Sequence, residues 1–91
     1  MDVKLDETGA LEFPCRYPIK AMTHRQDRAL DQVLGVLARH ETDFERESVR
    51  LRPSRNGRFQ SITVAVRAES RTHLETLYAE LRALDVVVML L

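Results

Sequence analysis

RPSRNGRFQSITV, the stretch from Arg52 to Val64, decides how the middle of the chain folds. Its Asn-Gly dipeptide is typical of a β-hairpin turn, because both residues tolerate the positive φ angles that a tight hairpin needs. A loop of two or four residues centred on Asn56-Gly57 places Leu51 opposite Ile62, and polar residues then also face one another: Arg52 opposite Ser61 and Arg50 opposite Thr63. A three-residue loop would shift the pairing by one residue and place apolar residues opposite polar ones. The stretch therefore predicts a hairpin in a sheet with one buried face, which carries Leu51 and Ile62.

The strand before this turn belongs at the edge of its sheet. Val49 and Leu51 alternate with polar residues, which is typical of a half-buried strand. Pro53 follows and cannot donate a ladder hydrogen bond, so we expect this strand to have a neighbour on one side only. The strand after the turn is expected from Ile62 to Ala68, with its apolar residues at every second position.

A strand and a helix are expected before the hairpin. Residues 17–22 alternate between apolar and other side chains, which predicts the first strand. Residues 23–26, Thr-His-Arg-Gln, have the form of a capping box, which predicts that a helix begins there. The apolar residues that follow share one helical face: Leu30, Val33, Leu34, Leu37 and Ala38.

A second helix and a last strand are expected after the hairpin. Residues 72–75, Thr-His-Leu-Glu, form a second capping box, and Ser70 is a rival N-cap. The helical stripe that follows is Leu74, Leu77, Tyr78 and Leu81. The run VVVMLL, Val86 to Leu91, is apolar at every position, so we expect a strand that is covered on both faces.

The order β-α-β-β-α-β predicts an α+β fold of the ferredoxin-like type. Right-handed crossovers place the first and third strands in the centre, so the expected antiparallel sheet has strand order 4-1-3-2. Two helices cover one face, and the other face is open. We expect one such domain over residues 11–91 and a flexible tail over residues 1–10, which are polar and lack a useful period.

The composition indicates a globular protein without a strong pull toward nucleic acid or lipid. Hydrophobic residues make up 44% of the 91 residues, and 14 basic residues balance 14 acidic ones. Cys15 is the only cysteine, so no internal disulfide can form, which suits the cytoplasm. No signal peptide and no apolar run of about 18 residues is seen, so we expect no membrane span.

Few residues are arranged for catalysis or metal binding. His24, His40 and His73 lie far apart and lack acidic or cysteine partners at ligand spacing. Cys15 lies beside Arg16, but no local motif supplies a histidine or acid partner for nucleophilic catalysis. We therefore expect no enzyme, no metal and no cofactor.

The hairpin loop is one candidate binding site. Arginines surround the Asn-Gly turn with Ser54 nearby, and guanidinium groups together with turn amides can hold an anion. No Walker pattern is present, and a solvated hairpin tip is the alternative interpretation, because charged loop tips are common. We expect the turn to form without Ser54, Arg55 and Arg58, which leaves these three residues unexplained. The candidate loop is Pro53, Ser54, Arg55, Asn56, Gly57, Arg58, Phe59 and Ser61.

The open sheet face is the second candidate. Its expected side chains on the first three strands include Lys20, Met22, Arg50, Arg52, Thr63 and Arg67. The last strand adds apolar side chains at the opposite edge, and an exposed apolar strand is typical of a partner surface. This pattern favours self-association or docking to another protein. The alternative is that residues 11–17, LEFPCRY, fold back and cover the face. RNA binding is not expected, because Phe59 is the only aromatic residue placed for base stacking.

Four segments together resemble the YbeD-like family of small bacterial proteins. They are LEFP at 11–14, PSRNGRFQS at 53–61, ETLYAEL at 75–81 and LDVVVMLL at 84–91. The resemblance implies a fold similar to ACT-type regulatory domains, a bacterial cytosolic protein and a regulatory or accessory role near lipoate attachment. It supplies no catalytic residues. Relatives in that fold class often have glycine where the first strand meets the first helix, whereas this chain has Thr23, which speaks against an ACT-type effector there.

The sequence thus favours a non-enzymatic regulatory or adaptor domain that acts through protein contact, and the family resemblance implies a link to lipoate metabolism. An anion or small-molecule effector domain is the alternative function, and RNA binding is the second alternative.

Overall fold

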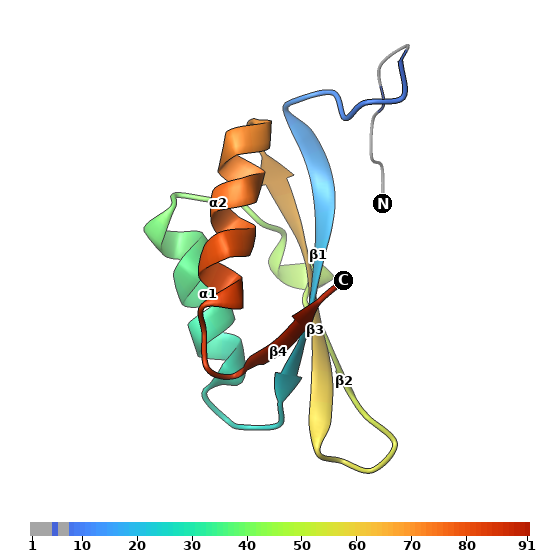
Figure 1. Cartoon of the computed structure of the whole chain (residues 1–91), viewed down its shortest axis with the longest axis vertical. Coiled ribbons are helices and arrows are strands. Elements are labelled where there is room, and N and C mark those ends of the chain that lie inside the picture. The colour runs from blue at the N-terminus through green and yellow to red at the C-terminus, as the bar shows by residue number, and fades with distance from the viewer. Residues whose placement is uncertain (1–4, 6–7) are drawn as a thin grey trace.

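The computed structural model describes residue 5 and residues 8–91, and it is built as one four-stranded antiparallel sheet with both long helices on the same face (Figure 1). The strand order is β2-β3-β1-β4, which confirms the predicted α+β, ferredoxin-like βαββαβ fold with strand order 4-1-3-2. The elements are β1 (Cys15–His24), α1 (Ala29–Arg39), the short 3₁₀ helix η1 (Arg46–Ser48), β2 (Arg50–Pro53), β3 (Phe59–Ala68), α2 (Arg71–Arg82) and β4 (Val87–Leu90).

The hairpin register predicted from the sequence is confirmed. Leu51 pairs with Ile62, and the neighbouring pairs are Arg50 with Thr63 and Arg52 with Ser61. The Ser54 N–H donates to the Phe59 carbonyl at 2.8 Å, which closes a loop of the four residues between them. Gly57 takes φ +75°, but Asn56 does not adopt a positive φ, so only the glycine supplies the left-handed conformation.

The predicted start of the first helix is wrong. Thr23 and His24 belong to β1, where Thr23 pairs with Val87, and α1 begins only at Ala29 with Arg28 as its N-cap. The Thr23 side chain is fully buried and its hydroxyl donates to the His24 carbonyl at 2.9 Å. Strand pairing and burial therefore override the local capping pattern.

The rival cap of the second helix is the one that forms. The Ser70 hydroxyl accepts the His73 N–H at 3.0 Å, and α2 begins at Arg71. Thr72 lies inside the first turn of the helix and is exposed. Both residues were predicted as candidates for the N-cap, and Ser70 has the extended backbone that an N-cap residue needs.

The core lies between the helices and the two central strands. Ile19 from β1 and Val64 from β3 pack with Leu37 of α1 and Leu77 of α2, and each of these side chains is at most 2% exposed. The buried face of α1 differs from the predicted apolar face. Ala38 is exposed, whereas Ala29 and Val36 are buried.

Both edge strands are more exposed than expected. Leu51 was expected in the buried face but is 49% exposed, and the last strand was expected to be covered on both faces. Val88 and Met89 of β4 are 46% and 48% exposed, and Leu91 is 57% exposed. In β4, Val87 and Leu90 pack against the core cluster and Val88 and Met89 do not, whereas all four residues of β2 are exposed.

The segment before β1 does not cover the open face. Leu11 and Phe13 pack against the core cluster, and residues 15–17 are part of β1 itself. Most of the tail expected over residues 1–10 lies outside the described residues, apart from a bridge between Leu5 and Leu11 and residues 8–10. Within the residues that the structure describes, no helix has the length and apolar character needed to cross a membrane.

Candidate functional site

The open sheet face carries two rows of polar side chains that meet over β3. In the first row, Thr63 of β3 lies between Arg50 of β2 and Lys20 of β1. In the second row, Ser61 lies between Arg52 and a methionine, Met22. Strict alternation along each strand places all of these side chains on the face away from the helices. The fold therefore gathers cations from two strands around the hydroxyl groups of a third.

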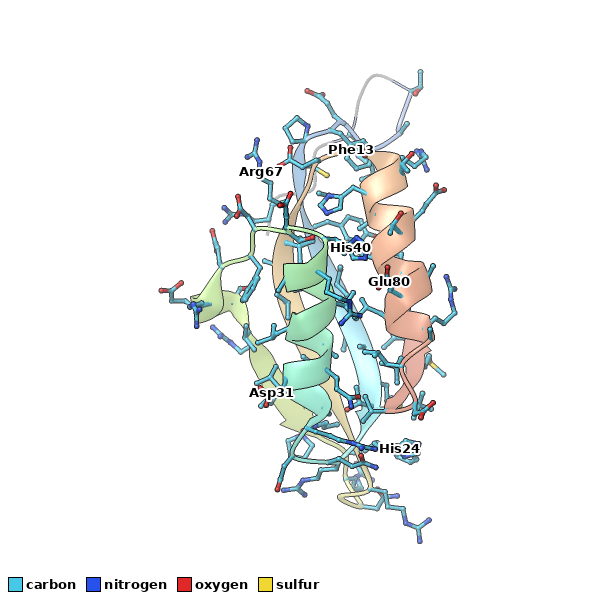
Figure 2. All side chains as sticks on the ribbon, turned by 90° about the vertical axis from the view of Figure 1, so that its left-hand side faces the viewer. Phe13, His24, Asp31, His40, Arg67 and Glu80 are labelled. Carbon is cyan, nitrogen blue, oxygen red and sulfur yellow. The ribbon has the colours of Figure 1, made fainter. Side chains whose placement is uncertain are left out.

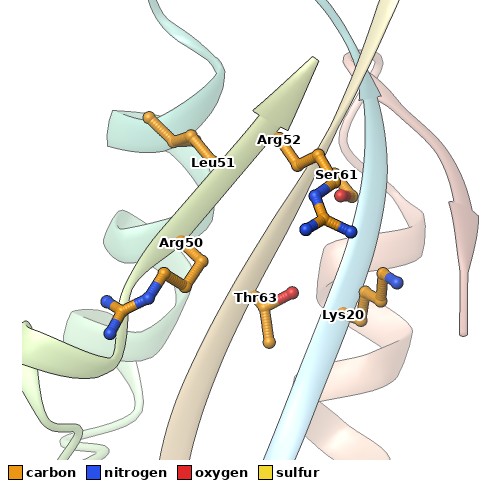
Figure 3. Close-up of a pocket in the computed structure, with 6 residues that line it drawn as sticks. All are labelled: Lys20, Arg50, Leu51, Arg52, Ser61 and Thr63. Carbon is orange, nitrogen blue, oxygen red and sulfur yellow. The ribbon is translucent and has the colours of Figure 1, made fainter. Parts of the chain in front are cut away.

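All of these residues except Met22 line a shallow depression of about 430 Å³, shown in Figure 3. The Arg52 side chain extends from β2 toward β1, so that its guanidinium group lies among Ser61, Thr63 and Lys20 in that view. The Arg50 guanidinium points away from them. The full lining is Lys20, Arg50, Leu51, Arg52, Ser61 and Thr63, and it includes no acidic residue.

The charges in the depression are not compensated by neighbours. Among the described residues, the side chains of Lys20 and Arg52 form no ion pair and no hydrogen bond. Arg50 donates to the backbone carbonyls of Glu47 and Val49, which fixes its position without neutralising its charge. A concentration of positive charge in a depression whose lining includes no acidic residue favours an anionic ligand or partner.

Two other arginines on the same face are paired. Arg16 forms an ion pair with Glu45 over the far half of the sheet, and Arg67 pairs with Glu69 at 3.0 Å. Arg67 was expected in the open-face site, but it lies at the other end of β3 and does not line the depression. Met22 also lies outside the lining. It pairs with Met89 on the β4 side of β1.

The hairpin loop uses its donors to build the turn. The Asn56 side-chain oxygen accepts from the Arg58 N–H and from the Ser54 hydroxyl, at 3.0 and 2.9 Å. The Phe59 N–H donates to the Ser54 hydroxyl at 3.1 Å, and the Gly57 N–H to the Ser54 carbonyl at 3.0 Å. Ser54 is therefore part of the turn, contrary to the expectation that the turn forms without it. The amides of residues 57–59 are engaged within the loop, which weakens its case as an anion cradle.

Two side-chain rings are in contact beside the hairpin turn, and the sequence did not predict this contact. His24 at the end of β1 pairs with Phe59 at the start of β3, and their rings lie 5.5 Å apart at 36°. His24 had been placed in a helix, so its strand neighbour was missed. Pro53, Arg55 and Arg58 lie around this end of the sheet and outside the lining of the depression.

The remaining histidines have structural partners. His73 accepts the Glu69 N–H at its Nδ1 atom at 3.1 Å, which leaves its Nε2–H to donate to the Thr42 hydroxyl at 2.8 Å. His40 contacts Glu80 between α1 and α2 (Figure 2), and this contact lowers the pKa of the Glu80 carboxyl, with Arg39 adding to the effect. Among the described residues, no three histidine, cysteine or acidic side chains form a group that could hold a metal ion.

The fold and the open sheet face define an ACT-like domain of the ferredoxin-like class. The chain superimposes on the solution structure of protein HP0495 from H. pylori with a TM-score of 0.78 at 17% identity, covering 93% of this chain and 89% of that one. It also matches the ACT domain of GTP pyrophosphokinase from Chlorobium tepidum, with a TM-score of 0.60 at 19% identity, covering 85% of this chain and 97% of that one. At these identities the likeness concerns the fold alone.

The chain belongs to the DUF493 family, described as a protein family of unknown function, whose model matches residues 9–91. A UPF0250 protein of Nitrosomonas europaea is 37% identical over 96% of this chain and all of its own length. A UPF0250 protein of Azotobacter vinelandii is 42% identical over 89% of each chain. These bacterial relatives confirm the resemblance to the YbeD-like family, and their names state no enzymatic activity.

Proposed function

We propose that this chain is a non-enzymatic regulatory or adaptor domain, formed by residues 11–91, that acts in the cytoplasm by contact with another protein. The contact surface in this proposal is the β4 edge of the sheet. The observation that carries it is the exposure of this edge, where Val88, Met89 and Leu91 are each about half exposed. β4 is also the last strand of the sheet, so one side of its backbone has no ladder neighbour.

The neighbouring residues support this choice of surface. Met22 and Met89 pair across β1 and β4, and methionine side chains adapt readily to the shape of a partner. A bulge between Met22 and Thr23 shifts the register and places Val88 outside the paired positions. Exposed apolar edges of this kind are where proteins add a strand from a partner. The link to lipoate attachment implied by the family resemblance is part of the proposal.

The test compares two surface substitutions of the same chemistry. Met89→Lys places a charge on the β4 edge, and Ala79→Lys places the same charge on an exposed position of α2. Each protein is used as bait for its own cytosol, with mass spectrometry of the captured proteins and sedimentation of the purified bait. We expect wild type and Ala79→Lys to retain the same partner or the same self-association, and Met89→Lys to lose it. Identical behaviour of all three proteins would contradict the proposal.

A further inference from the structure

We propose that the depression on the open sheet face binds a small ligand through a phosphate group. Arg52 and Lys20 supply the opposing charges, and the hydroxyl groups of Ser61 and Thr63 supply hydrogen-bond donors between them. This site is separate from the β4 edge, so either proposal can fail without the other.

The charge of the site selects an anion. Three cationic residues line the depression, although the Arg50 guanidinium points away from it (Figure 3), and none of the described ion pairs involves them. The other arginines of this face that pair with acids, Arg16 and Arg67, lie toward the opposite end of the sheet. The arrangement is therefore local to the depression and does not reflect a uniformly basic face.

The geometry suits a phosphate held from two sides. Neighbouring strands lie about 4.8 Å apart, so the backbones of Arg50 and Lys20, which flank Thr63, are about 10 Å apart. Arg52 lies two residues further along β2 than Arg50, and its guanidinium group points back over β3 (Figure 3). An anion above β3 is then within reach of a guanidinium fork from one side and an ammonium group from the other.

The hydroxyl groups make the floor of the site polar. Among the described residues, the Ser61 and Thr63 hydroxyls have no hydrogen-bond partner, although both residues are partly buried. A phosphate monoester carries about −1.5 to −2 charge at neutral pH and three acceptor oxygens, which matches the two cations Arg52 and Lys20 and the two hydroxyl donors. A carboxylate offers fewer acceptor sites and half the charge.

The size of the depression leaves room for more than the phosphate. Its volume of about 430 Å³ falls within the range of small-molecule sites, about 300–1,000 Å³. Leu51 is the one apolar residue in the lining, and its side chain points away from the other lining residues (Figure 3). The phosphate therefore dominates recognition, and the rest of the ligand contacts little apolar surface.

The test is a titration of the ¹⁵N-labelled full chain, followed by the chemical shifts of its backbone amides. The probes are inorganic phosphate, glycerol phosphate, acetate and a short single-stranded RNA. We expect both phosphates to shift the amides of Lys20, Ser61 and Thr63, and acetate to bind at least about tenfold more weakly. Tighter binding of glycerol phosphate than of inorganic phosphate would identify an organic phosphate as the ligand, and equal binding would identify free phosphate.

Two charge-removing variants decide whether the site is specific. Arg52→Gln is expected to weaken phosphate binding about tenfold, whereas Arg58→Gln, which removes the same charge from the same hairpin, is expected to change it less than twofold. Both side chains are exposed, so both variants should fold, and their spectra report this directly. The proposal is overturned by equal weakening in both variants, by the absence of any shift at millimolar phosphate, or by binding of RNA alone.

Discussion

Leu51 and Ile62 are direct partners in the β2–β3 ladder, yet their environments differ almost completely. The Leu51 side chain is 49% exposed at the edge of the sheet, and Ile62 is 1% exposed beneath the helices. The ladder register alone would place both side chains on the same buried face of the sheet. Their difference arises because α1 and α2 cover the central strands and stop short of β2.

This difference predicts unequal costs for two similar substitutions. Ile62→Ala removes buried methyl groups and leaves a cavity, so it should lower the free energy of unfolding by about 2–5 kcal/mol. Leu51→Ala removes a largely exposed side chain and should cost about 0.5 kcal/mol. Urea denaturation followed by circular dichroism measures both. Comparable losses for the two variants would show that β2 is more deeply packed than described.

The N-terminus of α2 offers a second matched pair. Ser70→Ala removes the hydroxyl that accepts the His73 N–H and should lower the free energy of unfolding by about 1 kcal/mol. Thr72→Ala removes a hydroxyl that makes no cap and should change stability little, since alanine favours the helix. Thermal unfolding of the two variants measures the contrast, and a larger loss for Thr72→Ala would refute the assignment of the cap.

Two glycines should respond to alanine in opposite directions. Gly57 has φ +75°, and an added Cβ would approach the Arg25 guanidinium at 3.3 Å, so Gly57→Ala should destabilise the protein by about 1 kcal/mol. Gly35 lies within α1 with its nearest neighbour, the Arg39 guanidinium, at 3.9 Å, so Gly35→Ala should stabilise the protein by up to about 1 kcal/mol. Chemical denaturation distinguishes these outcomes. Destabilisation by Gly35→Ala would mean that close helix packing requires the glycine.

The contact between His40 and Glu80 predicts a dependence of stability on pH. The pKa of Glu80 is lower in the folded chain than its ordinary value of 4.5, chiefly because of the hydrogen bond with His40. The contribution of this contact is therefore present above pH 4.5 and is lost as the pH falls through the lowered pKa. The stability difference between wild type and Glu80→Gln should shrink as the pH is lowered from 6 to about 3. Glu75→Gln, on the same helix, is the control, and a difference that stays constant with pH would contradict this explanation.

The sequence predicted the features that depend on short-range rules. The hairpin register followed from alternation and from Asn56-Gly57, and the edge position of β2 followed from Pro53. The fold class then followed from the order of the elements. The capping box at Thr23 misled because its strand partner, Val87, is distant in the chain, and no local pattern reveals that pairing.

The candidate site was predicted only in part. Five residues of the depression were expected on the open face because strand alternation places them there: Lys20, Arg50, Arg52, Ser61 and Thr63. Arg67 was included with them, and its pairing with Glu69 could not be foreseen from alternation alone. For β4 the sequence supported two expectations, coverage of both faces and exposed apolar side chains on the open face, since an apolar run does not reveal how far the helices extend over it. The exposure of Val88 and Met89 agrees with the second expectation.

The most direct test of the proposed function is site-specific photo-crosslinking in living cells. A photoreactive amino acid is placed at Met89 on the β4 edge or, as the matched control, at Ala79 on α2, both exposed positions. If the β4 edge is the contact surface, the protein with the probe at Met89 will form a discrete crosslinked product with one partner or with a second copy, and the control will not. Equal crosslinking from both positions, or none from Met89, would contradict the account.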